Sequence, residues 1–512
     1  MFGKEVFVSR RRSPSIGILR LLTPFVVLFV ATFSVHALDY AYSTAELAAL
    51  AHSVARDYDL ERYEIPGPEG SVTGISLLEL LPLMGEVHRL TIETAGGTET
   101  FRDGELGDEW GEAFFIPADT DGTPALLHRG DLYGDLRGIS FSGEPLDADG
   151  LEVWLSWEGT EELEELIRRL ARRHGIAADV DSVPGTEAKL AAQARARGAV
   201  PDLVMIQSSG VQTLVDTRAI QALDYLEIPN LIPQGRSAFT LEGRRWAVPF
   251  YFDTQVAFFN RSLYRRLPDR DWTLTGMEDL GRSLLRSGVE PMAWNAYSSN
   301  WLIPFQISWG KPALVDRDGG ITTNDRATLT SLRYILRLQD EGILVPMERD
   351  AMDARFIAGE IGMIFSGSYA IPYFESLGLD IAVRPYPINQ ETGRRLSPLL
   401  DFKGFVIPRR TQNPVLARRF LQYLTGPGVQ LRFCRDLYKL SVREDLRATL
   451  AEQMRYGDVL DQTIDTGTVI PPDRIYGVYK NTMWSLLRFA LTRRMTPEET
   501  LTRAQELMDA DR

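Results

Sequence analysis

The order of strand-like and helix-like segments from residue 150 onward constrains the fold of this chain most strongly. Apolar residues alternate over 151–155 as in a strand and then recur at helical spacing over 160–170, with Thr160 as the expected cap. A second strand is predicted over 176–183, a helix over 187–197 and a third strand over 203–206. Strands that alternate with helices in this way form a parallel sheet through right-handed crossovers. The sequence therefore predicts an α/β fold.

Two polar segments follow strands of this predicted sheet. Residues 156–159 come after the first strand and residues 207–210 come after the third. Open α/β sheets bind ligands beyond the carboxyl ends of their strands. We therefore expect the two segments to form one ligand-binding rim; the alternative is a pair of solvated loops with helix caps.

The N-terminal 37 residues have the pattern of an export signal. Basic residues at 10–12 precede an apolar run over 21–35, and Ala37 completes a small-residue cleavage site. Cleavage there gives an exported, periplasmic or extracytoplasmic protein. A retained membrane anchor is the alternative, because the run is at the short edge of what spans a bilayer. No cysteine follows the run, so we do not expect a lipoprotein.

Residues 38–149 are expected to form a small α+β accessory module. A helix is predicted over 43–57, a short helix over 77–83 and a hairpin over 87–101. A segment rich in Asp and Gly, 145–150, marks the predicted boundary. The module shows no motif that carries chemistry, and its role stays open.

Composition excludes several classes of protein. The chain has 70 acidic and 56 basic residues, with no basic cluster beyond the N-terminus, so a nucleic-acid partner is not expected. Its one cysteine, Cys434, and five scattered histidines offer no metal-ligand spacing. We therefore expect no metal site, which disfavours most hydrolases and metalloenzymes. We further expect no cofactor, no catalytic residues and a monomer that is not an enzyme.

Several landmarks beyond residue 200 follow one another in a specific order. They are Val200-Pro201-Asp202-Leu203-Val204, the segment 243–251 followed by 254–260, Trp272-Thr273 with 277–280, the series Phe356, Gly359, Met363, Gly367 and Tyr369, and 404–408 with 417–424. In this order, residues 150–512 resemble the extracellular solute-binding proteins of ABC importers, in the family that includes maltose-binding protein.

The resemblance implies two α/β lobes joined by three hinge crossings, in the periplasmic-binding-protein fold. The crossings are expected near 253–260, 365–369 and 401–406. Lobe 1 is expected to hold 150–253 and 367–402, and lobe 2 to hold 261–365 and 406–512. The implied function is capture of a sugar or oligosaccharide by hinge closure and its delivery to the membrane permease.

Eight of the nine tryptophans lie at or beyond residue 154, and aromatic faces stack on sugars while carboxylates and amides bond their hydroxyls. The positions that match the family's ligand contacts are Trp157, Glu158, Gln207, Ser208, Ser209, Asp253, Tyr297, Trp301, Tyr369, Asp401, Lys403 and Tyr479. Tyr476 competes with Tyr479 because the register there is uncertain by several residues. Trp154 is expected in the core.

Three alternatives stay open. An anionic solute such as a sugar phosphate would use the amides of 208–210 and Lys403. A glycosidase would use Glu158 and Asp253 as paired acids. A sensory or interaction protein would use the accessory module to dock a partner. The chain also departs from the family, since Asp401 and Phe402 replace the expected Gly-Gly pair.

Overall fold

The computed structural model describes residues 38–58, 63–67, 70–81, 87–102, 113–117, 123–143, 146, 150–157, 160–316 and 319–510. The predicted signal segment, Glu158 and most of the predicted 145–150 boundary lie outside these residues. Among the described residues, no helix has both the length and the apolar character that crossing a bilayer requires.

The N-terminal module combines two antiparallel sheets with one long helix. Its elements are β1 (Leu38–Ser43), α1 (Thr44–Tyr58), β2 (Tyr63–Gly67), β3 (Gly70–Ser76), α2 (Leu77–Leu80), β4 (Val87–Thr94), β5 (Gly97–Arg102), β6 (Ala113–Ile116), β7 (Ala125–His128), β8 (Asp131–Tyr133) and β9 (Leu136–Gly143). The sheet orders are β1-β9-β4-β5 and β2-β3-β6-β7-β8. A capping box begins α1, since Glu46 N–H donates to Ser43 Oγ and Ser43 N–H donates to Glu46 Oε2.

Lobe 1 is built on a mixed sheet in the order β11-β10-β12-β23-β15-β24, with β25 paired to β23. Its elements are β10 (Gly150–Leu155), α4 (Thr160–Arg173), β11 (Ala177–Ser182), α5 (Thr186–Ala196), β12 (Leu203–Gln207), η2 (Ser208–Gly210), α6 (Val211–Asp216), α7 (Pro233–Ala238), β13 (Thr240–Leu241), β14 (Arg244–Arg245), β15 (Val248–Asp253), β23 (Leu399–Val406), α13 (Pro414–Leu424), α14 (Pro427–Leu437), β24 (Leu440–Ser441), η6 (Glu444–Leu446), α15 (Arg447–Gln453), α16 (Gly457–Thr466) and β25 (Thr468–Val469). The predicted parallel strands are confirmed, because β10 pairs in parallel with both β11 and β12.

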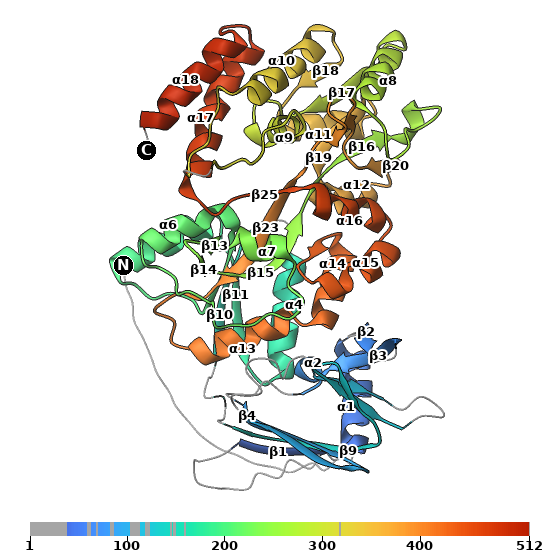
Figure 1. The fold of residues 1–512 in the computed structure, drawn as a ribbon, viewed down its shortest axis with the longest axis vertical. Helices are drawn as coiled ribbons and strands as arrows, with labels where there is room; N and C mark the ends of the chain where they lie inside the picture. The colour runs from blue at the N-terminus through green and yellow to red at the C-terminus, as the bar shows by residue number, and fades with distance from the viewer. Residues whose placement is uncertain are drawn as a thin grey trace, which may run out of the picture. The chain divides into compact units, whose positions relative to one another are not determined.

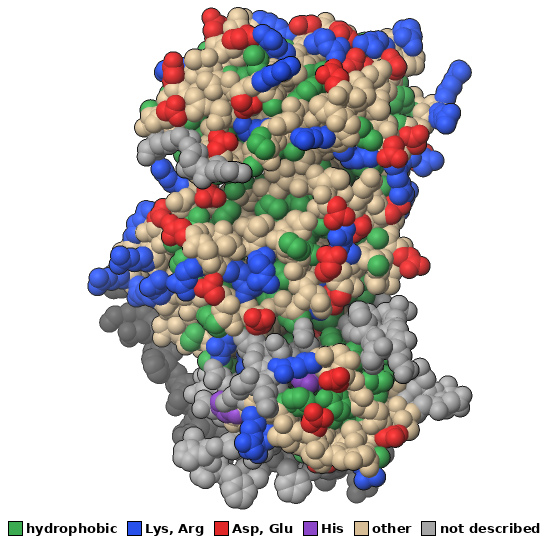
Figure 2. Space-filling view, viewed as in Figure 1, with side chains coloured by type: hydrophobic (Ala, Val, Ile, Leu, Met, Phe, Trp, Pro, Cys, Tyr) green, Lys and Arg blue, Asp and Glu red, His purple; other side chains and the backbone are tan. Residues whose placement is uncertain are grey.

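Lobe 2 is built on a second sheet in the order β18-β17-β19-β16-β20 (Figure 1). Its elements are β16 (Gln255–Asn260), η3 (Arg261–Leu263), α8 (Leu274–Arg286), β17 (Glu290–Trp294), η4 (Ser299–Trp301), α9 (Ile303–Ser308), α10 (Arg326–Asp340), β18 (Leu344–Pro346), α11 (Arg349–Ile357), β19 (Ile361–Gly367), η5 (Ser368–Ala370), α12 (Ile371–Ser376), β20 (Ile381–Arg384), β21 (Ile388–Asn389), β22 (Arg394–Arg395), α17 (Arg474–Leu491) and α18 (Pro497–Ala510). Acidic and basic side chains are interspersed over the face of the molecule in view in Figure 2.

The chain passes between the two sheets three times, at 253–255, 399–400 and 468–470. The first crossing agrees with the prediction near 253–260, because β15 belongs to the lobe 1 sheet and β16 to the lobe 2 sheet. The second and third crossings run side by side, since Leu399 and Leu400 pair with Thr468 and Val469.

The predicted crossing near 365–369 is wrong. The crossing predicted near 401–406 lies at 399–400, but the chain enters lobe 1 there instead of leaving it, so two of the lobe ranges are wrong. After β19 the chain continues in lobe 2, where β20 pairs with β16, so lobe 1 does not include 381–384. The segment from β23 to β25 belongs to lobe 1, because β23 pairs with β12 and β15 and α15 packs against α14. These pairings join strands far apart in the sequence, which local patterns do not encode.

The N-terminal module shares one continuous hydrophobic core with lobe 1. At the contact, the carboxylate of Glu79 on α2 is fully buried at the first turn of α14, where Val429 N–H donates to its Oε1 at 3.0 Å. Gly428 makes room for it, since a Cβ there would lie 2.6 Å from Oε2. Burial raises the pKa of Glu79 to about 7, although the amides of α14 and the guanidinium groups of Arg443 and Arg173 act against that rise.

This raised pKa predicts that the module contact loses stability as pH rises. Between the ordinary carboxyl pKa and about 7, the folded protein holds one more proton at Glu79 than the unfolded chain, so the free energy of unfolding falls through that window. Glu79→Gln should remove a pH-dependent contribution on the order of 3 kcal/mol, measured by urea unfolding at pH 5 and pH 8. The exposed Glu93→Gln is the control. Equal pH dependence in wild type and Glu79→Gln would contradict this.

Candidate functional site

Residues from three segments meet at the predicted rim of the lobe 1 sheet. Gln207, at the end of β12, donates from Nε2 to Asp401 Oδ1 at 2.6 Å, and Ser209 Oγ donates to Gln207 Oε1 at 3.3 Å. Trp157, after β10, has its ring centroid 5.7 Å from Lys403 Nζ. Trp157 also has a φ of 85°, a strained conformation for a residue with a side chain. The predicted rim therefore exists as a single polar cluster.

A buried group of charges lies at the first crossing. Asp253 is 2% exposed and accepts from Lys439 Nζ at 2.9 and 3.1 Å, from Ser368 Oγ at 3.1 Å and from Lys403 Nζ at 3.5 Å. Lys403 Nζ also donates to Asp401 Oδ2 at 2.7 Å. Two lysines and two aspartates thus form a charge-compensated chain, which we call the hinge cluster (Asp253, Asp401, Lys403 and Lys439).

The ionisation of the hinge cluster follows from its geometry. Burial alone would raise the pKa of Asp253, but the ammonium groups of Lys439 and Lys403 outweigh burial and hold that pKa below its ordinary value. Burial alone would lower the pKa of Lys403, but Asp401 and Asp253 raise it above its ordinary value. Asp253 and Lys403 therefore both stay charged at neutral pH.

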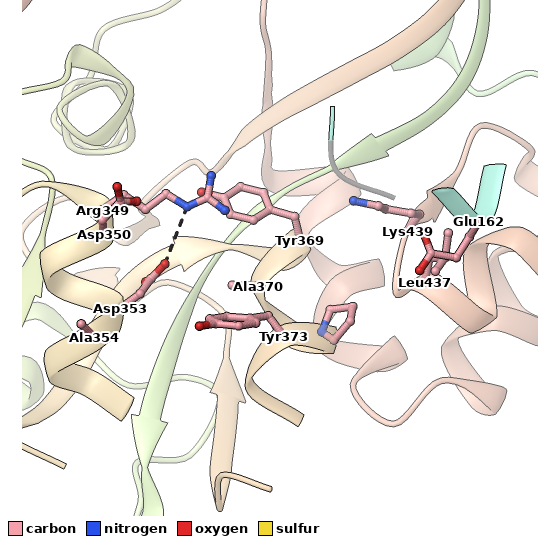
Figure 3. A pocket seen from close by; sticks show the side chains of 11 residues that line it. Glu162, Arg349, Asp350, Asp353, Ala354, Tyr369, Ala370, Tyr373, Leu437 and Lys439 are labelled. Carbon is pink, nitrogen blue, oxygen red and sulfur yellow. Dashed lines mark ion pairs between the residues drawn. The ribbon is translucent and has the colours of Figure 1, made fainter. Parts of the chain in front are cut away.

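The hinge cluster borders a cavity of about 590 Å³ whose walls come from both lobes (Figure 3). Lobe 1 contributes Glu162, Leu437 and Lys439, and lobe 2 contributes Arg349, Asp350, Asp353, Ala354, Tyr369, Ala370, Pro372 and Tyr373. In Figure 3 the side chain of Lys439 extends toward Tyr369 from the opposite wall. A cavity of this size falls within the range of small-molecule sites.

The lobe 2 wall presents two aromatic rings beside charged groups. The Arg349 guanidinium lies 4.3 Å from the ring centroid of Tyr369 and pairs with Asp353 at 3.7 Å. Burial raises the pKa of Asp353 to about 6, against the opposing effect of Arg349. Three carboxylates, those of Glu162, Asp350 and Asp353, face two cationic side chains around this cavity. Its ionised lining is therefore weakly negative.

Comparisons with known proteins agree with this two-lobed architecture. Residues 165–453, more than half of the chain, match the bacterial extracellular solute-binding protein family. The chain belongs to this family. The maltodextrin-binding protein MdxE of Bacillus subtilis is 20% identical over 353 residues, which cover 64% of this chain and 82% of that protein.

Solved structures show the same fold for this solute-binding protein. The GacH receptor of Streptomyces glaucescens, studied unliganded and with acarbose, is 17% identical with a TM-score of 0.64, over 71% of this chain and 99% of that one. The maltotriose-binding protein of Thermus thermophilus is 19% identical with a TM-score of 0.62, over 71% of this chain and 100% of that one.

The twelve predicted ligand residues of this solute-binding protein are distributed over several environments. Tyr369 is the one that lines the cavity. Trp157, Gln207, Ser209, Asp253, Asp401 and Lys403 belong to the rim and the hinge cluster. Glu158 lies outside the described residues. Ser208 is buried and donates to the carbonyl of Ile470 at the third crossing, at 3.0 Å.

On the second lobe, Tyr297 and Trp301 follow β17, and the Tyr297 ring lies under the Arg488 guanidinium at 4.6 Å. Tyr479 is fully buried in the lobe 2 core, where its hydroxyl donates to Gln306 Oε1, and it does not line the cavity. Tyr476, three residues earlier on α17, is buried in the same core, where its hydroxyl donates to Asn300 Oδ1 at 2.7 Å. Trp154 is buried as predicted.

Sequence reasoning missed five cavity residues that carry charge and one that is aromatic. They are Glu162, Arg349, Asp350, Asp353 and Lys439, and Tyr373. Tyr373 follows Tyr369 by four residues, a spacing that places two side chains on one helical face and that could have indicated the second ring. The charged residues carry no such signal, because each resembles an ordinary surface residue.

The hinge cluster predicts a large cost for removing its central carboxylate. Asp253→Asn leaves the buried Lys439 without a counter-charge and should lower the free energy of unfolding by about 3–5 kcal/mol. Asp224→Asn is the matched control, because Asp224 pairs with Arg244 at the surface, and it should cost about 1 kcal/mol or less. Urea unfolding of both variants measures the difference, and equal costs would show that Asp253 is not needed to hold the crossing together.

Proposed function

We propose that this protein captures an uncharged sugar or oligosaccharide in the cavity between its lobes. The observation that carries the proposal is the lining, which combines the rings of Tyr369 and Tyr373 with the acceptors Glu162 and Asp350 and the donor Lys439. Aromatic faces stack on the C–H faces of a sugar, and polar groups that bond its hydroxyls reject ligands that lack them. The sugar-binding relatives support the same ligand class.

An anionic ligand such as a sugar phosphate fits this geometry less well. The lysines of the hinge cluster already face two aspartates. The segment 208–210 already faces the carboxylate of Glu187, which accepts from Gln207 N–H at 3.0 Å and lies against Gly210. Carboxylates also outnumber cations around the cavity.

A hydrolytic role is also disfavoured. Asp253 is held ionised and buried between two lysines, so it offers neither the proton of a general acid nor access for a sugar. Within the described residues, no group of three or more His, Cys, Asp and Glu side chains is arranged to hold a metal ion. We therefore propose binding without chemistry.

Closure of the lobes would distinguish the ligand-bound protein from the free protein. A ligand that contacts both walls stabilises the closed state by its differential affinity for that state, and reversing a 1:99 preference takes about 5.5 kcal/mol. We propose that the exported monomer, freed of residues 1–37, presents its ligand in this state to the membrane permease of an ABC importer. A separate hypothesis is that the N-terminal module docks a partner. It rests only on the presence of this additional module.

The aromatic wall gives the direct test. Tyr369→Ala should weaken saccharide binding by about 2 kcal/mol, roughly 30-fold, because it removes the stacking surface from the centre of the lining. Isothermal titration calorimetry with a panel of mono- and oligosaccharides measures the change.

Tyr225→Ala is the matched control, because Tyr225 is 51% exposed on lobe 1 and does not line the cavity. Equal affinities of the two variants, or the absence of binding by the wild type across the panel, would contradict the proposed function. Strong salt dependence of binding would favour the anionic alternative.

A further inference from the structure

A second, smaller cavity adjoins the first on lobe 1. It has a volume of about 190 Å³ and lies between α4 and α14. Glu162 and Leu437 line both cavities, so the two are neighbours that share a wall. The second cavity therefore lies directly beside the first, with the side chains of Glu162 and Leu437 at the boundary.

Both walls of this second cavity belong to one lobe. Its lining consists of Glu162, Glu165, Leu166 and Arg169 from α4, and Arg432, Phe433, Asp436 and Leu437 from α14. The two helices pack on the same core through residues such as Leu163, Ile167 and Leu431. Its shape is consequently independent of how far the lobes are open, unlike that of the first cavity.

The lining has the chemistry of a saccharide subsite. Phe433, Leu166 and Leu437 supply apolar surface for the C–H face of a sugar ring. Around them stand three carboxylates, from Glu162, Glu165 and Asp436, and the guanidinium groups of Arg169 and Arg432. The carboxylates accept hydrogen bonds from sugar hydroxyl groups and the guanidinium groups donate to them. The excess of carboxylates over guanidinium groups disfavours a phosphate.

We propose that this α4–α14 groove is an extension subsite that binds the end of an oligosaccharide whose remaining units lie between the lobes. The inference rests on the proposed function and names its substrate class: a saccharide chain longer than the interlobe cavity holds. Because lobe 1 alone provides the groove, the end of the oligosaccharide binds before the lobes close. Closure then encloses the sugar units that lie between the lobes.

The test compares a series of linear oligosaccharides of increasing length on wild type and on Glu165→Trp. Glu165 is exposed on α4, so an indole there fills the groove without entering the core. For the wild type, affinity should rise by about tenfold when the chain becomes long enough to reach the groove. Glu165→Trp should lose this rise and keep the affinity of the shortest binding saccharide within about twofold.

Two control variants separate the effect of filling the groove from the effect of removing the charge of Glu165. Glu165→Gln removes the charge alone and should retain most of the rise with length. Arg172→Trp adds the same bulk on the same helix, at an exposed position outside the groove, and should retain all of it. Thermal unfolding of each variant verifies that the fold is intact.

The outcomes distinguish this inference from the proposed function. A wild type that binds short saccharides without any rise for longer ones, or a Glu165→Trp variant that keeps the full rise, would overturn the extension subsite and leave the proposed function standing. A wild type that binds no saccharide of any length would overturn the proposed function and the subsite with it.

Discussion

The buried carboxylate of Asp253 is the interaction on which the rest of this structure depends. It lies where the chain first passes from one sheet to the other. It forms ion pairs with Lys439, which directly precedes β24, and with Lys403 of β23. Ser368, which directly follows β19 in lobe 2, donates to Asp253 and accepts from the Thr254 amide, so lobe 2 is attached at the same point. Because an unpaired charge is costly in such an environment, we expect these partners to stay together in any movement of the lobes. The cluster is then the pivot of the closure that we propose.

The same compensation of charge extends to the cavity that we propose as the ligand site. Lys439 donates two hydrogen bonds to Asp253 and also lines the interlobe cavity. The hinge cluster and the cavity therefore share this residue. A neutral ligand can bond such a group without disturbing the balance of the cluster, whereas a bound anion would compete with Asp253 for the ammonium. The N-terminal module contacts the start of α14 through the buried Glu79, and the other end of the same helix supplies Leu437 to both cavities.

The parts of this fold that local patterns encode could be predicted, and those that depend on distant pairing could not. The alternation of strands and helices over 150–207 identifies β10, β11 and β12, and from them the rim at Trp157 and Gln207. The lobe to which β20 and β23 belong is decided by partners more than a hundred residues away, and the ranges assigned from sequence were wrong there. Glu79 and Arg349 illustrate a second limit. A charged side chain predicts exposure, so nothing in the sequence indicates that one is buried at a helix start and the other lines a cavity.

Movement of the lobes about the hinge cluster is the central claim, and a distance across the cavity tests it most directly. Glu161 on α4 and Ala351 on α11 are exposed neighbours of cavity residues on opposite walls. The chain's one cysteine, Cys434, is buried, so spin labels attach selectively to the double variant Glu161→Cys, Ala351→Cys. Double electron–electron resonance should show that the distance between the labels shortens at a saturating concentration of a binding saccharide. An unchanged distance distribution at saturation would contradict capture by closure.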